Sequence, residues 1–257
     1  MSALGRDHEL AVERLLEAGF TREDAAEAVT VLQPVIGIGF EQTAVPLGGS
    51  KIGGRPHVPE SFVWPDDLAF VAQVNFAECK PFDFAGVLPS TGIMYVFNTC
   101  EEGDIGAGDE GDDVVRYYTG PSSELIVADF PDELHKVEGR FVERRMVFSK
   151  SYVLAPEDEL GAGRPNGRDE EVLEAVGGAG VEGRMLGRPR FFRPELDDAF
   201  DPETATLLLA LSGMDLWRSD DDQFSIYGDG EFFVIVLNGA LRDENIEDAW
   251  VLVESGT

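Results

Sequence analysis

The chain has 257 residues, of which 43% are hydrophobic, enough to bury the core of one large domain or two small ones. Its 50 Asp and Glu residues outnumber its 20 Lys and Arg residues, which gives a net charge of -30. So few cations disfavour binding to DNA or RNA, because phosphates are neutralised by Lys and Arg. No apolar run approaches the roughly 20 residues of a membrane helix, and the polar N-terminus does not resemble a signal peptide. We therefore expect a cytoplasmic protein that does not enter a membrane.

The acidic residues are spread along the chain, and lysine is rare. Dispersed acidity of this kind is typical of a surface that keeps chains soluble, and it favours adaptation to a salt-rich cytoplasm. The alternative is a surface that mimics nucleic acid or masks a basic partner protein.

The first 34 residues are predicted to form a helical hairpin packed on the main body. Apolar residues recur at helical spacing over 8–33, and Gly19 is a plausible helix stop. Thr21 begins a segment that resembles a capping box, and Pro34 is expected to close the pair. This divides the chain into a hairpin at 1–34 and a main domain at 35–257.

Residues 46–78 combine glycine pairs, four prolines and a tryptophan ahead of an alternating strand. Prolines stiffen such a loop, and we expect Trp64 to anchor it to the core. Alternation over 70–76 predicts a strand with one apolar and one partly polar face, and the composition of 93–97 predicts a buried strand. Further strands are predicted at 114–118, 124–128, 141–149, 207–211 and 230–235, and a short helix capped by Asp169 at 169–176.

The second part of the chain repeats this pattern in weaker form. A Gly-Arg-Pro loop, a strand, a glycine turn and a hydrophobic strand recur in the same order. We therefore predict a mainly β (α+β) fold with two related antiparallel β-rich halves and a few short helices. The halves, at about 35–150 and 180–257, would meet at a cleft. Chance recurrence of short Gly-Pro motifs is the alternative.

In the order of these motifs the chain resembles the YwqG-like family of bacterial and archaeal proteins of unknown function, over roughly residues 35–253. The resemblance implies a mostly antiparallel, two-lobed β-rich fold and no established catalytic residues. Relatives encoded near toxin and immunity genes suggest a binding role. Two positions depart from the family pattern: Tyr227 replaces a frequent tryptophan, and Ala210 a frequent glutamine. The matching segments are 50–56 with Pro59 and Trp64-Pro65, 70–76, 92–97, 186–192 and 227–230.

The sequence contains no recognisable catalytic or metal-binding motif. It lacks a Gly-x-Ser-x-Gly elbow, a His-Glu-x-x-His pair, a Cys-x-x-Cys pair and a phosphate loop. Cys79, Cys100 and the histidines lack zinc-ligand spacing, and the acidic loop at 101–113 does not follow the calcium-loop pattern. We therefore predict no metal and no cofactor, and catalytic residues stay unassigned.

Polar residues inside the repeated motifs are the candidates for ligand binding. Rare cations in a stiff loop can hold an anion, and amide side chains on a strand can recognise a ligand by hydrogen bonds. The alternative is structural, because the same groups can tie loops to carboxylates, satisfy backbone groups or cap turns. The candidates are Lys51, Arg55, His57, Gln73, Asn75, Arg188 and Asp229.

These features support two functional hypotheses. The first is a binding or regulatory protein, such as an immunity-type protein that masks a basic partner, because the chain is acidic and lacks a catalytic constellation. The alternative is an enzyme or small-ligand-binding protein that uses the cleft between the two β-rich halves, lined by Lys51, Arg55, Gln73 and Asp229.

Overall fold

The computed structural model describes residues 3–65, 68–99, 113–132, 134, 141–155, 168–178, 181–189, 191, 200, 203–212 and 231–254. Within these residues the protein is mainly β and begins with a helical hairpin, as predicted. The predictions for Cys100, for residues 101–112 of the acidic loop at 101–113, and for Asp229 lie outside the described residues.

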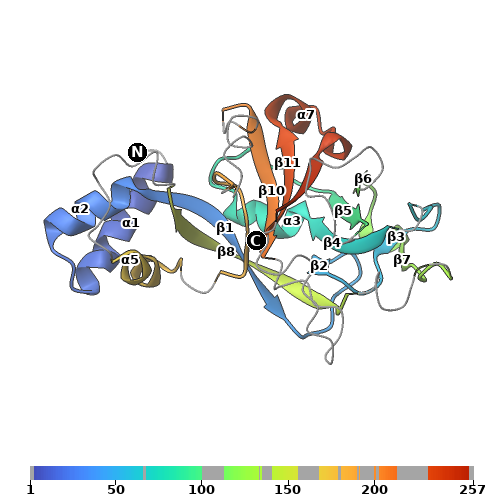
Figure 1. Ribbon diagram of the computed structural model, residues 1–257, viewed down its shortest axis with the longest axis horizontal. Helices are drawn as coiled ribbons and strands as arrows, with labels where there is room; N and C mark the ends of the chain where they lie inside the picture. The colour runs from blue at the N-terminus through green and yellow to red at the C-terminus, as the bar shows by residue number, and fades with distance from the viewer. Residues whose placement is uncertain are drawn as a thin grey trace.

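Ten strands form one antiparallel sheet centred on the long pair β1 (Leu32–Glu41) and β8 (Arg144–Leu154) (Figure 1). We call β2, β4, β5 and β6, which follow outward from β8, the first wing. The second wing is β9, β10, β11 and β12, which follow outward from β1. The wing strands are β2 Lys51–Ile52, β4 Ala69–Asn75, β5 Ile93–Asn98, β6 Asp113–Tyr118, β9 Gly183–Met185, β10 Ala205–Ser212, β11 Glu231–Leu237 and β12 Trp250–Glu254.

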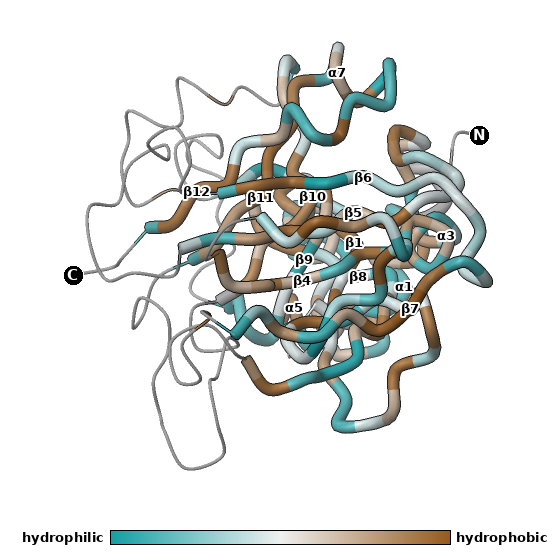
Figure 2. Tube along the Cα trace, turned by 90° about the vertical axis from the view of Figure 1, so that its right-hand side faces the viewer, coloured by the Kyte–Doolittle hydropathy of each residue, from teal (hydrophilic) through white to brown (hydrophobic). Residues whose placement is uncertain are grey.

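The inner face of the sheet encloses the main apolar core, to which all ten strands contribute buried residues. The edge strands β6 and β12 meet (Figure 2). The backbone N–H of Tyr117 on β6 donates to Oε1 of Glu247 at 3.1 Å, from the 3-10 helix Ile246–Asp248 that precedes β12. The sheet is thus curved so that its two edge strands face each other. This contact covers sheet edges that would otherwise expose unpaired backbone groups.

Each wing carries a smaller apolar cluster on its outer face. In the first wing, Phe70 and Phe97 are covered by the two-stranded sheet of β3 (His57–Pro59) and β7 (Leu125–Val127). Trp64 anchors this cover as predicted, because its ring packs edge-on against Phe97 at 5.4 Å and its Nε1 donates to the Leu68 carbonyl. The outer cluster of the second wing is Phe200, Ala205, Leu207, Ala210, Phe233, Ile235 and Leu252.

Three helices cover one end of the central pair, far from the wings in Figure 1: α1 (Ala3–Glu17), α2 (Arg22–Thr30) and α5 (Asp169–Val176). The Thr21 side chain accepts the backbone N–H of Asp24 at 3.1 Å, which confirms the predicted cap of α2. No helix in the described part of the chain is long and apolar enough to span a membrane. The remaining helices are α3 Phe76–Cys79, α7 Asn238–Arg242 and the 3-10 helices Lys80–Phe82 and Ser122–Glu124.

Three local predictions are wrong. Pro34 does not end the hairpin but lies inside β1, beyond the segment that pairs with β9, where a single neighbouring strand tolerates a proline. The strand predicted to reach Phe76 ends at Asn75, whose Oδ1 accepts the Ala77 N–H and caps α3. Asp169 is the first residue of α5 rather than its cap.

Candidate functional site

Lys51, Gln73 and Tyr95 lie side by side across β2, β4 and β5 in the first wing. All three side chains are buried, so the strand face predicted to be partly polar is not solvent-exposed. The Lys51 amine donates to the Arg55 carbonyl at 2.5 Å and to Oε2 of Glu143 at 2.6 Å. The fully buried lysine therefore ties the loop that contains Arg55 to Glu143, in the segment that leads into β8.

His57 on β3 covers this row. Its backbone N–H donates to Oε1 of Gln73 at 2.8 Å, and its carbonyl accepts the Tyr95 hydroxyl at 2.6 Å. Its Nδ1 accepts the Gly48 N–H at 3.0 Å, while Nε2 of Gln73 donates to the Gly49 carbonyl at 2.6 Å. These side chains satisfy the buried backbone of the glycine-rich loop, so their hydrogen-bonding groups are used inside the protein.

The charges in this cluster depend on burial. Because Nδ1 of His57 accepts a hydrogen bond, the ring proton of the neutral imidazole lies on Nε2, 3.4 Å from the Lys51 amine. Burial, and then the positive charge of Lys51, lower the pKa of His57 to about 4. Burial also lowers the pKa of Lys51, against the opposing effect of its hydrogen bond to Glu143. His57 is therefore neutral at physiological pH and has no proton acceptor to offer a substrate.

Asn75 and Arg55 have separate structural contacts. Nδ2 of Asn75 donates to the Gly48 carbonyl at 2.9 Å, while its Oδ1 caps α3. Arg55 turns outward, and its Nη1 lies 2.8 Å from Oδ1 of Asp129 in an ion pair with 49% and 93% of the two side chains exposed. The structure thus brings Lys51, His57 and Gln73 together, with Asn75 at the same loop, but leaves Arg55 at the surface.

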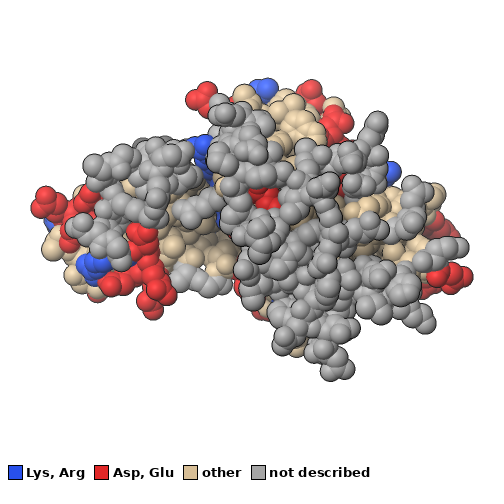
Figure 3. Space-filling model, in the orientation of Figure 1, with Lys and Arg blue, Asp and Glu red and all other residues tan. Residues whose placement is uncertain are grey.

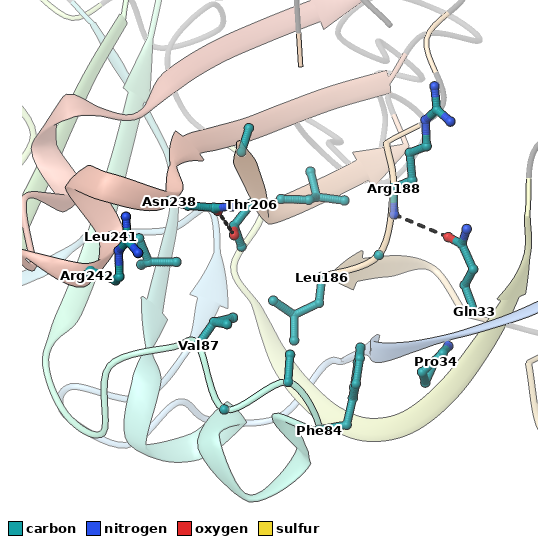
Figure 4. Close-up of a pocket in the computed structure, with 15 residues that line it drawn as sticks. Gln33, Pro34, Phe84, Val87, Leu186, Arg188, Thr206, Asn238, Leu241 and Arg242 are labelled. Atoms are coloured by element: carbon teal, nitrogen blue, oxygen red, sulfur yellow. Dashed lines mark hydrogen bonds between the residues drawn. The ribbon is translucent and has the colours of Figure 1, made fainter. Parts of the chain in front are cut away.

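A pocket lies elsewhere in the described part of the chain, where the second wing faces the loop that follows α3. It has a volume of about 760 Å³. Of the sequence candidates that the structure describes, only Arg188 lines it. Figure 4 shows the side chains that surround it. The lining consists of Gln33, Pro34, Phe84, Ala85, Gly86, Val87, Leu186, Gly187, Arg188, Ala205, Thr206, Leu207, Asn238, Leu241 and Arg242.

The pocket lining has an unusual composition for this protein. Among the residues that the structure describes, it contains Arg188 and Arg242 but no Asp or Glu, although the chain as a whole has a net charge of -30. Apolar side chains such as Phe84 and Leu186 form much of the remaining wall. Such a site can hold a partly apolar molecule and favours negative over positive charge.

Sequence reasoning missed Arg242, Asn238 and Thr206. Arg242 follows no motif, and the available signal was only that it is one of few cations in a very acidic chain. Asn238 and Thr206 come together through tertiary structure: the Thr206 hydroxyl donates to Oδ1 of Asn238 at 2.6 Å, and Nδ2 of Asn238 donates to the Glu203 carbonyl.

The backbone at the pocket is strained at one position. Leu186 has φ 64, in the left-handed region, and is followed by Gly187 with φ 73. A non-glycine residue in this region costs about 1 kcal/mol or more. The Leu186 N–H donates to the Leu207 carbonyl at 2.9 Å, which holds the turn against the pocket wall.

Two kinds of group that often serve catalysis are a reactive thiol and a metal-binding cluster. Cys79 is buried, and burial raises the pKa of its thiol to about 12, which makes it a poor nucleophile. Among the described residues, no three His, Cys, Asp or Glu side chains cluster so as to hold a metal ion.

The fold and the site define a curved antiparallel sheet protein with a pocket where its second wing faces the loop that follows α3. Residues 50–254 match the family model described as a domain of unknown function, DUF1963, and the chain belongs to that family. The match begins one residue before β2 and ends at the last residue of β12. No curated protein matches the chain.

Proposed function

We propose that the protein binds a small organic ligand in the pocket between its second wing and the loop that follows α3. The observation that carries this proposal is a pocket of about 760 Å³ whose described lining has apolar walls, two arginines and no acidic residue, in a chain of net charge -30. The strained backbone of Leu186 supports it, since strain of this kind concentrates at functional sites.

The test is a thermal-shift screen of a metabolite panel against the wild type and a variant whose pocket is filled. Val87 lines the pocket, and Figure 4 shows its side chain among the lining residues, so Val87→Trp should block the space. Val63→Trp is the matched control, because Val63 is 82% exposed and does not line the pocket. We expect at least one compound to raise the melting temperature of the wild type and of Val63→Trp, but not of Val87→Trp. An equal response of all three proteins would contradict the proposal.

A partner-masking role is the second candidate, because acidic side chains gather on the helical end (Figure 3). The first turn of α2 carries Glu23 and Asp24, and that of α5 carries Asp169, Glu170 and Glu171. Such a surface attracts a basic protein in a salt-dependent way. A pulldown at moderate and high salt should recover a basic partner that a Glu170→Lys, Glu171→Lys variant loses. Recovery of the same proteins by both would count against this role.

We also propose four further properties of the protein. It is a YwqG-like member of the family, it is located in the cytoplasm, its cell is rich in salt, and its chain contains an internal duplication. The salt-rich assignment predicts that potassium chloride raises the melting temperature, because salt screens the repulsion within a chain of net charge -30. A melting temperature that does not rise between low and molar salt would argue against it.

A further inference from the structure

The two arginines of the pocket lie at opposite sides of it in Figure 4. We propose that the ligand is an elongated organic dianion, with an acidic group at each end and an apolar body between them. This inference rests on the proposed ligand-binding function and names the chemical class of the ligand.

One end of the pocket is formed by Arg242 with Asn238, from α7, and by Thr206 from β10. Asn238 and Arg242 are four residues apart on one helix and therefore point the same way. The bonds of Asn238 to Thr206 and to the Glu203 carbonyl fix the amide at this end. Arg242 is exposed and has neither an ion pair nor a hydrogen bond with any described residue. Its guanidinium can therefore bind an anionic group without first breaking an internal contact.

The other end is formed by Arg188, which follows the strained turn at Leu186 and Gly187. Its backbone N–H donates to Oε1 of Gln33 on β1 at 3.4 Å, which links this end of the pocket to the central strand pair. A guanidinium carries five donors. The Arg188 side chain can therefore bind a carboxylate or phosphate with some of these donors and keep others for a contact within the protein.

Apolar side chains separate the two ends. Phe84 and Val87 come from the loop after α3, while Leu186 and Leu207 come from the second wing. In Figure 4, Leu186 and Val87 lie lower than the two arginines, with Arg242 to their left and Arg188 to their upper right. A ligand that spans the pocket must therefore be apolar in its middle, because a polar group there would lose its water without gaining a partner.

Charge selects among the ligands that could fill this space. Among the described lining residues, a cation would meet two arginines and no carboxylate. A neutral molecule would use the walls but not the guanidiniums, and a monoanion would use only one of them. An acid group at each end uses both, and each charge-assisted pair adds affinity and fixes orientation.

The inference can be tested with three ten-carbon probes that differ only at their ends: sebacate, which has two carboxylates, decanoate, which has one, and the corresponding diol. Isothermal titration calorimetry on the full chain should give a dissociation constant about tenfold lower for sebacate than for decanoate, and a still weaker diol. Arg188→Gln and Arg242→Gln should each weaken sebacate binding about tenfold and make sebacate no better than decanoate. Arg22→Gln, which removes an exposed arginine on α2, is the control for net charge and should change nothing.

Several outcomes would overturn the dianion while leaving the pocket as a ligand site. Decanoate that binds as tightly as sebacate would show that one charged end suffices. A diol that binds equally, and is lost in Val87→Trp, would show that the pocket accepts neutral ligands. If no probe binds, the dianion class is wrong, and the metabolite screen with the same variant then judges the proposed function independently. A loss of sebacate binding in Arg22→Gln as large as in Arg242→Gln would indicate a long-range charge effect instead of a site.

Discussion

The turns that follow β2 and β9 occupy equivalent places on the two sides of the central strand pair. In each, two consecutive residues have positive φ: 58 and 66 at Gly53 and Gly54, and 64 and 73 at Leu186 and Gly187. The turn of the first wing is closed over by a buried polar cluster, whereas the turn of the second wing lines the pocket.

The strand residues under the two turns explain this difference. β4 and β10 both carry a register shift, between Phe70 and Ala72 and between Leu207 and Leu209, and counting from these shifts matches Gln73 with Ala210. The row Lys51, Gln73, Tyr95 then corresponds to Arg184, Ala210, Phe233. Alanine and phenylalanine have no polar atoms to bond a loop backbone, so the second wing lacks the ties that close the first.

The register of the central pair places the two wings at corresponding positions along it. Gly39 on β1 pairs with Val147 on β8. β2 pairs with β8 at Arg145, which lies two residues before Val147. In the same way, β9 pairs with β1 at Gly37, which lies two residues before Gly39. Each central strand also precedes one wing in sequence but borders the other. An internal duplication stays a prediction, but if it occurred this arrangement would place β8 with the second wing.

The largest expected effect comes from Gln73→Leu, which makes the first wing resemble the second. The substitution leaves the His57 N–H and the Gly49 carbonyl buried without partners, and each lost partner costs about 1–3 kcal/mol. We expect a loss of about 4 kcal/mol in the free energy of unfolding, measured by urea denaturation. Thr206→Val, which removes one hydrogen bond from β10, is the matched variant and should cost about 1 kcal/mol. Equal losses for the two would mean that the polar cluster is no stronger than an ordinary strand contact.

The next largest effect is the pH dependence caused by His57. Its pKa of about 4 in the folded protein lies below its ordinary value of 6.5, so the unfolded chain binds more protons between these pH values. Stability is therefore unaffected by this group above pH 6.5 and falls as pH decreases from 6.5 to 4, by about 3 kcal/mol in total.

Denaturation of the wild type and His57→Asn across this range separates the histidine from the many carboxylates. The asparagine can keep an acceptor near the Gly48 N–H but does not titrate. We expect the wild type to lose about 3 kcal/mol more than the variant between pH 6.5 and 4. Parallel curves for the two proteins would show that His57 does not titrate with a lowered pKa.

Local patterns in the sequence were sufficient for much of the fold but for little of the pocket. Alternation and turn residues predicted β4 and β5, and the Thr21 cap predicted the start of α2, because these signals depend on neighbouring residues. The pairing of β1 with β8 joins segments about a hundred residues apart and left no local signal. The polar residues of the motif were noticed, yet sequence could not distinguish a residue whose side chain bonds its own loop, such as Gln73, from a residue that lines a pocket, such as Arg188.

A smaller effect is expected from Tyr95→Phe, which gives the first wing the aromatic residue that the second has at Phe233. The change removes only the hydroxyl that donates to the His57 carbonyl at 2.6 Å, and the ring keeps its packing. We expect a loss of about 1.5 kcal/mol in urea denaturation, the value of one buried hydrogen bond. A loss as large as that of Gln73→Leu would mean that the hydroxyl holds the whole loop in place.

The smallest effect on stability is expected at Arg55, which holds the place after the first turn that Arg188 holds after the second. The ion pair of Arg55 with Asp129 is exposed on both sides, and such pairs contribute little because water and salt screen them. Arg55→Gln should therefore change the free energy of unfolding by less than about 0.5 kcal/mol and leave sebacate binding unchanged. Arg188→Gln should weaken that binding, since only the second arginine lines the pocket. If both variants weakened sebacate binding equally, the two turns would not differ in function, and the contrast between a closed first wing and an open second wing would fail.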